Sequence, residues 1–545
     1  MELSLQACNE QRSQQLQREA HRARPVKLTD LSSYADAQRH FSLARLWELF
    51  DGDRERLSIA HECVDRHATS PDRVALRIAL ADGHDEHITY EHLKVHSCRV
   101  AHFLRARGVM PGDRVAIMLE PSLAFYVALF GAIKAGAIAV PLFTLFGPDG
   151  LRLRIDDCKP KLLLTNPQKA PIAAGMAGLD VVIADDAFMA TLDRFPPEFA
   201  WTSKADDLAI FQYTSGTTRE LPEAVRHTHR AIVLVMIAAL YGTGIRPGDA
   251  YFCPSSPAWG HGLWHGTLAP LAFGLTVGTY SGRFDADRLM RALQDFRTTN
   301  LSAAATHYRM MKNAGTASRY RFSLNKLTFT GEPIDSDTAA FVERTFGRLP
   351  ASFYGTTEVG VVLASYPGAA DLPVKAGALG KPLPGGRVEV QDRAGRSLPP
   401  HAIGEIKVWR RDKWIPTKDL GWTDADGYFY HGGRADDVII SAGWTMSAVE
   451  IEDAMLKHAD VSEAAAIGVA DPVRGQVVKA FVVSPRSGGD DFIAEIQELV
   501  RARLSAHEYP RQIVFVAELP KTAAGKVNRK VLRDREAAAS TASNG

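Results

Sequence analysis

Residues 112–142 read GDRVAIMLEPSLAFYVALFGAIKAGAIAVPL, and this stretch decides the class of fold. The run RVAIML is short and apolar, as is typical of a buried strand, and AIAVPL after Gly136 has the same character. Between the two runs, Ser122 can cap a helix that ends near Gly136. Strand, helix and strand in this order predict a buried βαβ unit with two parallel strands.

The same alternation recurs further along the chain. Apolar runs at 250–254, 275–280, 300–304 and 326–330 are candidate strands, and helical patterns such as DADRLMRALQDF separate them. We therefore expect an α/β fold, with a large N-terminal domain of mixed or parallel sheets covered by helices. Between residues 376 and 432, short strands alternate with Gly, Pro and Asp turns, which predicts a β-rich subdomain.

A compact unit closes the chain after the turn HGGRADDVII. Its pattern is a helix SAVEIEDAMLKH, strands near VSEAAAIGV and QVVKAFVVS, a helix IAEIQELVRARL and a strand QIVFVA. This order predicts a small α+β domain, and we expect the division to fall between domains 1–434 and 435–545. The final run EAAASTASNG is small and polar, so we expect it to be frayed.

The composition is that of an ordinary soluble globular protein. Of 545 residues, 46% are apolar, and 64 basic side chains balance 63 acidic ones, so nothing favours a nucleic-acid partner. Five cysteines lie far apart without a CxxC pair, which favours a reducing, cytoplasmic setting over disulfides or zinc. The apolar stretch Leu123–Phe146 is broken by Lys134, Gly136 and Pro141, so we expect no membrane span.

A hydroxyl-rich loop is the first candidate site. Residues 213–230 read YTSGTTRELPEAVRHTHR, and TSGTT follows the apolar strand LAIFQY. Backbone amides at a glycine turn and several hydroxyls can surround a polyphosphate, although a plain Ser/Thr-rich turn is the alternative. Neither GxxxxGK[ST] nor GxGxxG occurs, which argues against a Walker loop or a dinucleotide-binding turn. The candidate residues are Thr214, Ser215, Gly216, Thr217 and Thr218.

Four further segments follow this loop at strand exits or in polar turns. Alone, each has a plain alternative as a turn, a strand end or a solvated surface run. The carboxyl end of a parallel strand is, however, where a ligand crevice is expected. The segments are GEP at 331–333, YGTTE at 354–358, TKDLGWTDADGYFYHGGRADD at 417–437 and PKTAAGK at 520–526.

With these motifs in this order, the sequence resembles the adenylate-forming superfamily of acyl- and aryl-CoA synthetases, peptide-synthetase adenylation domains and luciferases. The match spans residues 50 to 535, and the runs TGEP, ADPVRGQVVKAFVV and YPRQIVFVAELPKTAAGK look closest to medium-chain acyl-CoA synthetases. The resemblance implies two steps. A carboxylate attacks the α-phosphate of ATP to give acyl-adenylate and pyrophosphate, and a thiol, usually of CoA, then displaces AMP.

The resemblance also implies a role for each motif residue in binding ATP and Mg²⁺. Residues 214–218 would wrap the β- and γ-phosphates. Cations are needed where negative charge builds up at the α-phosphorus, which suits magnesium and Lys526. The implied nucleotide and catalytic residues are Gly331, Glu332 and Pro333 along the adenine, Tyr354 stacked on the base with Gly355 and Thr356 beside it, Thr357 at the α-phosphate, Glu358 on magnesium, Asp419 and Arg434 on the ribose, and Lys526 between carboxylate and α-phosphate.

The acid, the thiol and the domain rotation have their own implied residues. Trp259 in SSPAWGHG stands where relatives place an aromatic gate over the carboxylate, with His261 and Gly262 beside it, although a core tryptophan is the alternative. Gly443 and Trp444 would line a CoA channel, and Asp436 would be the hinge of the C-terminal domain. Where the acetyl-specific branch has a tryptophan this chain has Gly355, which implies a larger acid: medium-chain, cyclic or aromatic.

The phosphate loop departs from the family pattern TSGTTGxPKG. Arg219 replaces its second glycine, and Glu223 stands at its lysine position. A carboxylate about 4 Å from a phosphate charge costs on the order of 4 kcal/mol at an effective dielectric of about 20. Arg219 has the fork that suits phosphate, so we expect weaker ATP binding, provided Glu223 points to solvent.

The leading hypothesis is therefore an ATP-dependent carboxylic acid:CoA ligase. Two alternatives stay open: a stand-alone enzyme that loads a carrier-protein thiol, and a catalytically weak acyl- or nucleotide-binding homologue. Lys526 on a glycine-flexed loop argues against the weak homologue, because a protein without catalysis has no need of it. The expected partners are a small carboxylic acid and CoA, and a homo-oligomer is left open.

Overall fold

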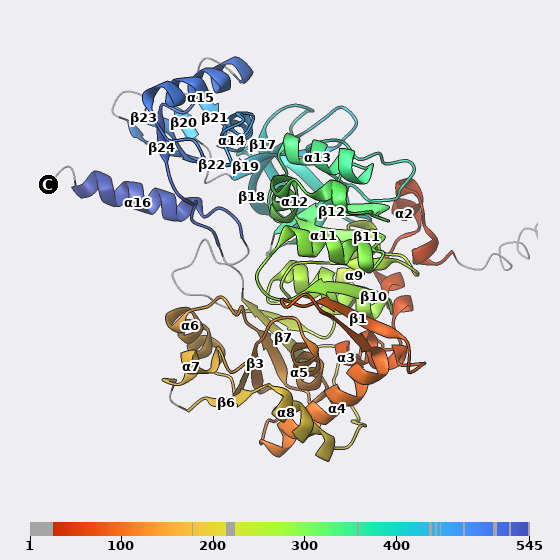
Figure 1. Cartoon of the computed structure of the whole chain (residues 1–545). Helices are drawn as coiled ribbons and strands as arrows, with labels where there is room; N and C mark the ends of the chain where they lie inside the picture. Colours follow the sequence, from red (N-terminus) through yellow and green to blue (C-terminus); the bar gives the residue numbers. More distant parts are fainter. Residues whose placement is uncertain are drawn as a thin grey trace, which may run out of the picture.

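The computed structural model describes residues 26–176, 178–213, 224–356, 359–434, 439–441, 444–446, 448–471, 475–504, 509–522 and 525–542. Over these residues the strands form a 13-stranded, a six-stranded, a three-stranded and a two-stranded sheet. In Figure 1 the six-stranded sheet lies at one end of the molecule, the large sheet in the middle, and the C-terminal unit at the other end.

The six-stranded sheet contains the βαβ unit that the sequence predicts. Its order is β6-β5-β3-β4-β7-β8, and every neighbouring pair is parallel except β7 with β8. Helix α5 (Leu123–Lys134) joins β3 to β4, and the Ser122 hydroxyl accepts a hydrogen bond from the Phe125 amide at 3.3 Å. The strands are β3 (Arg114–Met118), β4 (Ile138–Pro141), β5 (Leu162–Thr165), β6 (Asp180–Ile183), β7 (Leu208–Tyr213) and β8 (Ala224–Thr228).

Helix α5 is apolar because it is buried. It packs on α4 (Tyr90–Ala106), and its residues from Phe125 onward are buried. Even its terminal Lys134 is enclosed, with Nζ 2.6 Å from Asp65 Oδ1. Within the described part of the chain, no helix is both long enough and apolar enough to cross a membrane.

The 13-stranded sheet has a parallel half and an antiparallel half. The parallel half runs in the order β13-β12-β11-β9-β10-β1, with β2 antiparallel at its edge. The four predicted strands are confirmed as β9, β10, β11 and β12. The bounds are β1 (Val74–Ala79), β2 (Asp85–Thr89), β9 (Ala250–Phe252), β10 (Thr276–Tyr280), β11 (Asn300–Ala304), β12 (Lys326–Thr330) and β13 (Ala351–Thr356).

The β-rich segment is confirmed, but it forms no separate sheet. It continues the large sheet beyond β13 through antiparallel pairs in the order β14-β15-β19-β18-β17-β16. The sequence pattern alone did not reveal this continuity, because strand pairing across 13 strands is a long-range property. The bounds are β14 (Gly360–Ala364), β15 (Ala378–Pro382), β16 (Val388–Gln391), β17 (Gly404–Arg410), β18 (Lys413–Thr423) and β19 (Phe429–Arg434).

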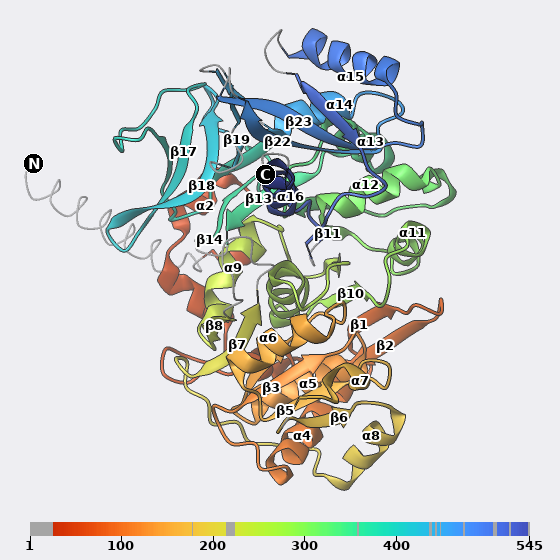
Figure 2. The ribbon, with the colours of Figure 1, turned by 90° about the vertical axis from the view of Figure 1, so that its left-hand side faces the viewer.

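Helices cover both large sheets (Figure 2). Leucine and methionine side chains of α11 and tyrosine and methionine side chains of α12 pack with β9, β11 and β12 in one hydrophobic cluster. The helices of this part are α2 (Tyr34–His40), α3 (Ile59–Cys63), α6 (Pro148–Cys158), α7 (Ala170–Ala173), α8 (Asp186–Thr191), α9 (Ala231–Tyr241), α10 (Ala269–Ala272), α11 (Ala286–Asp295), α12 (Ala305–Ala314) and α13 (Ser336–Phe346).

The C-terminal unit is a small α+β domain with its own core, as the sequence predicts. The sheet β22-β23-β24 carries a hydrophobic cluster that includes Ile451, Met455 and Ile496. The predicted frayed tail is wrong, because the last helix continues to Ala542. The elements are β20 (Ile439–Ser441), β21 (Trp444–Met446), α14 (Ala448–Met455), β22 (Glu463–Asp471), β23 (Gly475–Val483), α15 (Asp490–Arg503), β24 (Gln512–Phe515) and α16 (Arg529–Ala542).

Candidate active site

Three segments that are distant in sequence meet at Gly331, directly after β12. Gly331 has φ +98°, which favours glycine, and a Cβ there would lie 3.1 Å from Trp259 Cη2 and 3.4 Å from Lys526 Cε. The loop after β12, the segment before the π-helix His261–Leu268 and the loop before α16 therefore converge on one point. The candidate site is built around this point.

Lys526 reaches this point from the C-terminal unit. Two hydrogen bonds join it to Thr522: the Thr522 amide donates to the Lys526 carbonyl at 2.7 Å, and the Lys526 amide donates to Thr522 Oγ1 at 3.3 Å. The Lys526 ammonium lies 5.8 Å from the centre of the Trp259 ring, within the range of a cation–π contact. The predicted catalytic lysine and the predicted gate are thus neighbours.

Glu332, predicted to line the adenine, has its carboxylate engaged by protein groups. Thr306 Oγ1 donates to Glu332 Oε1 at 2.6 Å, and Arg309 Nη1 donates to the same oxygen at 3.3 Å. Arg309 also bonds Asp335, the residue that caps α13. Burial alone would lower the pKa of Arg309, but Glu332 and Asp335 raise it above its usual value. Arg309 was not predicted, because nothing in the local sequence pattern distinguishes it from a surface cation.

Tyr354 and Asp419, predicted to bind base and ribose, lie together across the sheet. Tyr354 Oη on β13 donates to Asp419 Oδ2 on β18 at 2.5 Å, and Asp419 is only 4% exposed. Asp419 pairs in register with Arg434 on β19, the other residue predicted for the ribose. Thr356 Oγ1 is buried and has no hydrogen-bond partner among the residues that the structure describes. A polar ligand at this edge would supply one.

Gly355 carries no information about the size of the acid. A Cβ on Gly355 would lie 2.0 Å from the carbonyl oxygen of Gly360 and 2.6 Å from the Cα of Val361. Glycine is therefore required by the close packing of β13 on β14. The inference from Gly355 to a larger acid loses its basis, since the space beside this residue is filled by backbone.

The segment that carries Trp259 continues into a π-helix. π-Helices are rare in proteins, and those that occur are often found at functional sites. His261 is 4% exposed and is held on both ring nitrogens: Nδ1 lies 2.9 Å from Ser255 Oγ and Nε2 lies 2.9 Å from Ser302 Oγ. Its ring is 5.2 Å from the ring of Trp259. Burial keeps the pKa of His261 well below its usual value, so this histidine is neutral.

Gly262 is fixed by packing. A Cβ there would lie 2.1 Å from the carbonyl oxygen of Ser256, so this position accepts no larger residue without a backbone shift. Trp259 itself is half-buried. Its ring lies near the Lys526 ammonium, at 5.8 Å, and near the ring of His261, at 5.2 Å.

The hydroxyl-rich loop predicted to bind phosphate begins and ends on two paired antiparallel strands, and the sequence did not predict the second of them. Tyr213 at the end of β7 pairs with Ala224 at the start of β8. Asp157 Oδ2 accepts from Tyr213 Oη at 2.6 Å and from the Ala224 amide at 3.2 Å, so one carboxylate ties both ends of the loop to α6. His227 lies on β8, and His229 lies shortly before the start of α9.

Several predicted residues cannot be placed. The loop residues 214–218 with Arg219 and Glu223 lie outside the described residues, as do Thr357, Glu358, Asp436 and Gly443. Of Arg434 and Trp444 only the backbone is described. Their predicted roles stay predictions.

A polar contact joins the C-terminal unit to the large domain beside the site. The Ser336 amide at the start of α13 donates to Asp453 Oδ1 at 3.2 Å, and Lys457 Nζ lies 2.9 Å from Asp337 Oδ1. Lys457 also bonds the hydroxyl of Ser336. We call Ser336, Asp337, Asp453 and Lys457 the α13–α14 latch. Figure 1 shows α14 and α13 on neighbouring edges of the two units.

Comparisons with known proteins agree with this architecture. A family model described as AMP-binding enzyme matches residues 64–411, and one described as AMP-binding enzyme C-terminal domain matches residues 450–526. The chain is 31% identical to the acetyl-coenzyme A synthetase of Bacillus subtilis, over 92% of this chain and 95% of that one. It is 28% identical to the mitochondrial acyl-coenzyme A synthetase ACSM3 of Mus musculus, over 84% and 86% respectively.

A solved structure shows the same fold. The benzoate CoA ligase from Burkholderia xenovorans LB400 superimposes with a TM-score of 0.75 at 27% identity, over 88% of this chain and 100% of that chain. The likeness therefore extends over both the large domain and the C-terminal unit.

Proposed function

The chain belongs to the AMP-binding enzyme family, and on this premise we propose that it joins a carboxylic acid to CoA through an acyl-adenylate, with release of pyrophosphate and then AMP. As a member of this family of AMP-forming acyl-CoA synthetases, it is an acid–thiol ligase that uses ATP and CoA. The observation that carries the proposal is the convergence of Lys526, Trp259 and Gly331 at the carboxyl end of β12.

In this proposal, Lys526 serves the first step. Its ammonium group would neutralise the charge that builds up as the acid's carboxylate meets the α-phosphate of ATP. Tyr354 and Asp419, already joined by a hydrogen bond, would hold base and ribose, and Thr356 Oγ1 would bond the nucleotide. Magnesium would enter with ATP and be held by Glu358. No general base is needed, because a carboxylic acid is ionised at neutral pH.

The C-terminal unit would then rotate to admit CoA. We place the domain boundary at 434/435, with Asp436 as the hinge and Gly443 and Trp444 along the CoA channel. The α13–α14 latch would hold the arrangement in which Lys526 reaches the site. We also place the protein in the cytoplasm, in line with the four described cysteines, which are buried and free.

The acid is proposed to be larger than acetate: medium-chain, cyclic or aromatic. Gly355 does not support this proposal, and the named relatives include both an acetyl-coenzyme A synthetase and a benzoate CoA ligase. Support comes from the benzoate CoA ligase, whose fold this chain shares over 88% of its length.

The test is pyrophosphate release from ATP over a panel of carboxylic acids, with and without CoA. We expect release that requires an acid, with CoA consumed in equal amount. Adenylation of the acid without CoA consumption would point to loading of a carrier-protein thiol, and absence of turnover on every acid would overturn the proposal.

A matched pair of lysine variants tests the role of Lys526. Lys526→Ala is expected to abolish adenylate formation and to leave thioester formation from a supplied acyl-adenylate largely intact. Lys521→Ala is the control, because Lys521 lies in the same loop but pairs with Glu463 at 2.9 Å. Equal loss of both steps in Lys526→Ala would refute the assignment.

A further inference from the structure

Beside Gly260, the residue after Trp259, lies a group of buried and half-buried polar side chains that the adenylation chemistry does not use. Gln212, the second-last residue of β7, is 6% exposed, and its amide group would be 3.6–3.7 Å from a Cβ on Gly260. Trp264 and His265 on the π-helix and His227 on β8 belong to the same group. A site for a plain alkyl chain needs apolar walls, so these residues require an explanation.

The orientation of the Gln212 amide follows from its one partner. Trp264 Nε1 can only donate, and it donates to Gln212 Oε1 at 3.0 Å. This bond fixes the amide, so that Nε2 is a donor. Nε2 is buried and has no hydrogen-bond partner among the described residues. The ring of His227 packs on Trp264 at 4.8 Å and holds the indole in place.

His265 adds a second unused polar atom. Its Nδ1 is buried without a partner in the part of the chain that the structure describes. Its ring lies 5.3 Å from the ring of Phe353, the residue before Tyr354. Burial lowers the pKa of His265 to about 4, so the ring is neutral and can donate or accept.

Unpaired buried polar groups are rare in native proteins, and each one calls for a ligand or water to complete it. Gln212 Nε2 is such a donor: it is enclosed beside the proposed acid site, and the hydrogen bond from Trp264 to Oε1 holds the amide in place. This is the arrangement expected of a group that recognises a substrate. We infer that Gln212 Nε2 binds an oxygen substituent on the acyl part of the acid, so that the enzyme selects a hydroxy or oxo acid over its unsubstituted analogue.

This inference rests on the proposed function and names the substrate class of that same site. A site that bonds a substrate hydroxyl or carbonyl discriminates strongly against the analogue without it, because the protein donor is then left unpaired. His261 plays no part in it, because both of its nitrogens are already taken by Ser255 and Ser302.

The experiment compares kcat/KM for pairs of acids that differ in one group. Hydroxy- and methyl-substituted benzoic acids, with the substituent at each ring position, and hydroxy- and methyl-substituted butanoic acids form the panel. We expect at least one hydroxy acid to be preferred over its methyl partner by about 10-fold or more. Equal or higher kcat/KM for every methyl acid would overturn the inference and leave the ligase proposal standing. Absence of pyrophosphate release with all acids would instead overturn the ligase proposal.

Two variants separate recognition from structure. Gln212→Met removes the donor at similar length, and we expect it to reduce the hydroxy-over-methyl preference about 10-fold. Trp264→Phe removes the bond that fixes the amide but leaves Nε2 able to donate, so we expect a smaller loss of the preference than in Gln212→Met. Thermal unfolding of both variants checks that they fold. If Gln212→Met keeps the full preference, or if both variants lose it alike, Gln212 is not the recognition group.

Discussion

The α13–α14 latch is expected to make the balance between the two half-reactions sensitive to one lysine, Lys457. Lys457 Nζ lies 2.9 Å from Asp337 Oδ1, with the two side chains 14% and 49% exposed. At this distance the Coulomb energy is about 1.4 kcal/mol in water and about 6 kcal/mol at an effective dielectric of about 20. Half-exposed pairs lose most of this to solvent and side-chain entropy, so we take about 1 kcal/mol, a factor of about 5 in population.

The perturbation is Lys457→Met, which keeps the length of the side chain and removes its charge. The arrangement that brings Lys526 to Gly331 is then expected to lose about 5-fold in population relative to the other arrangements. Where this arrangement is the minor one in solution, adenylate formation falls by the same factor. Thioester formation from a supplied acyl-adenylate is expected to stay unchanged or to rise, because that step does not use this arrangement.

The assay measures the two half-reactions separately: single-turnover pyrophosphate release for the first, and CoA consumption with pre-formed acyl-adenylate for the second. Lys530→Met is the control, because its exposed pair with Asp534 lies within α16 and joins no other unit. A double-mutant cycle with Asp337→Asn should show strong non-additivity. Equal loss in both half-reactions, or additive effects of the two variants, would refute the reasoning.

Three further predictions concern the site and its support. Gly331→Ala puts a Cβ 3.1 Å from Trp259 at a backbone φ of +98°, so we expect the rate of pyrophosphate release to fall about 10-fold or more. Gly315→Ala is the control, because Gly315 has φ +67° but faces open space, and it should leave the rate nearly unchanged. Equal effects of the two variants would contradict the steric argument. Arg309→Met removes the cation that Glu332 and Asp335 share and leaves Asp335 only its longer pair with Lys312, at 3.7 Å. Urea unfolding should show a loss of about 3 kcal/mol, against less than about 0.5 kcal/mol for the exposed Arg486→Met. Burial lowers the pKa of His229 to about 4, so on acidification the unfolded chain takes up this proton before the folded protein does. The free energy of unfolding is therefore expected to fall between pH 6.5 and pH 4, by about 1.4 kcal/mol per pH unit from this group. His229→Asn should flatten this dependence of unfolding free energy on pH, and an unchanged slope would count against the argument.

Much of the fold could be predicted because its signals are local. The apolar runs, the Ser122 cap and the glycine turns each act within a few residues, and they located β3, α5, β4 and the strands from β9 to β12. Strand β8 was missed because AVRHT alternates weakly and is half-buried on both faces. The tail was misjudged because small polar residues look frayed, yet alanine is the best helix former and four alanines lie within the last turns of α16.

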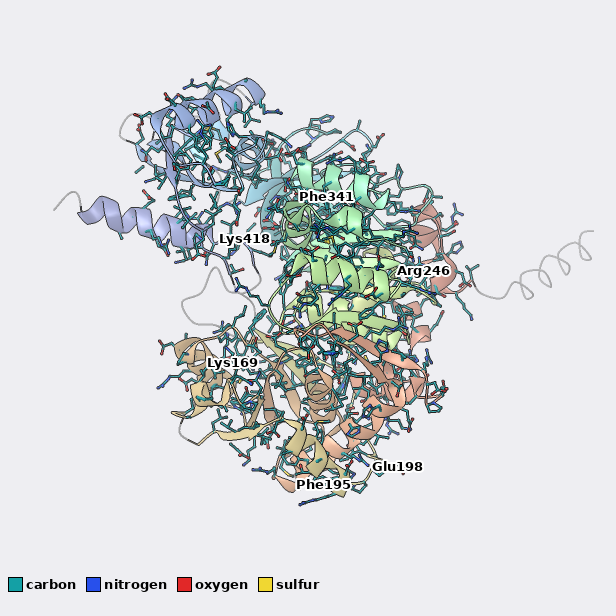
Figure 3. All side chains as sticks on the ribbon, in the orientation of Figure 1. Lys169, Phe195, Glu198, Arg246, Phe341 and Lys418 are labelled. Atoms are coloured by element: carbon teal, nitrogen blue, oxygen red, sulfur yellow. The ribbon has the colours of Figure 1, made fainter. Side chains whose placement is uncertain are left out.

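The candidate site was harder, because its geometry depends on contacts between distant segments. Motifs identified Gly331, Trp259 and Lys526, but only the folded chain shows that they meet. Arg309 and Gln212 carry no motif, and their environments come from other elements. Figure 3 illustrates the reason: charged side chains such as Lys169, Arg246 and Lys418 are spread over many elements, and sequence alone does not tell a site cation from the rest.

The close packing at Gly355 has a consequence for redesign of this enzyme. Where a glycine opens the acyl site of an enzyme, replacing that glycine by a bulky residue is the natural way to restrict the enzyme to shorter acids. Here any side chain at position 355 would strike the carbonyl oxygen of Gly360 and disrupt the β13–β14 hairpin before it reached the acid. Mutagenesis for chain length is therefore better aimed at Trp259, which is half-buried and belongs to no strand of the sheet.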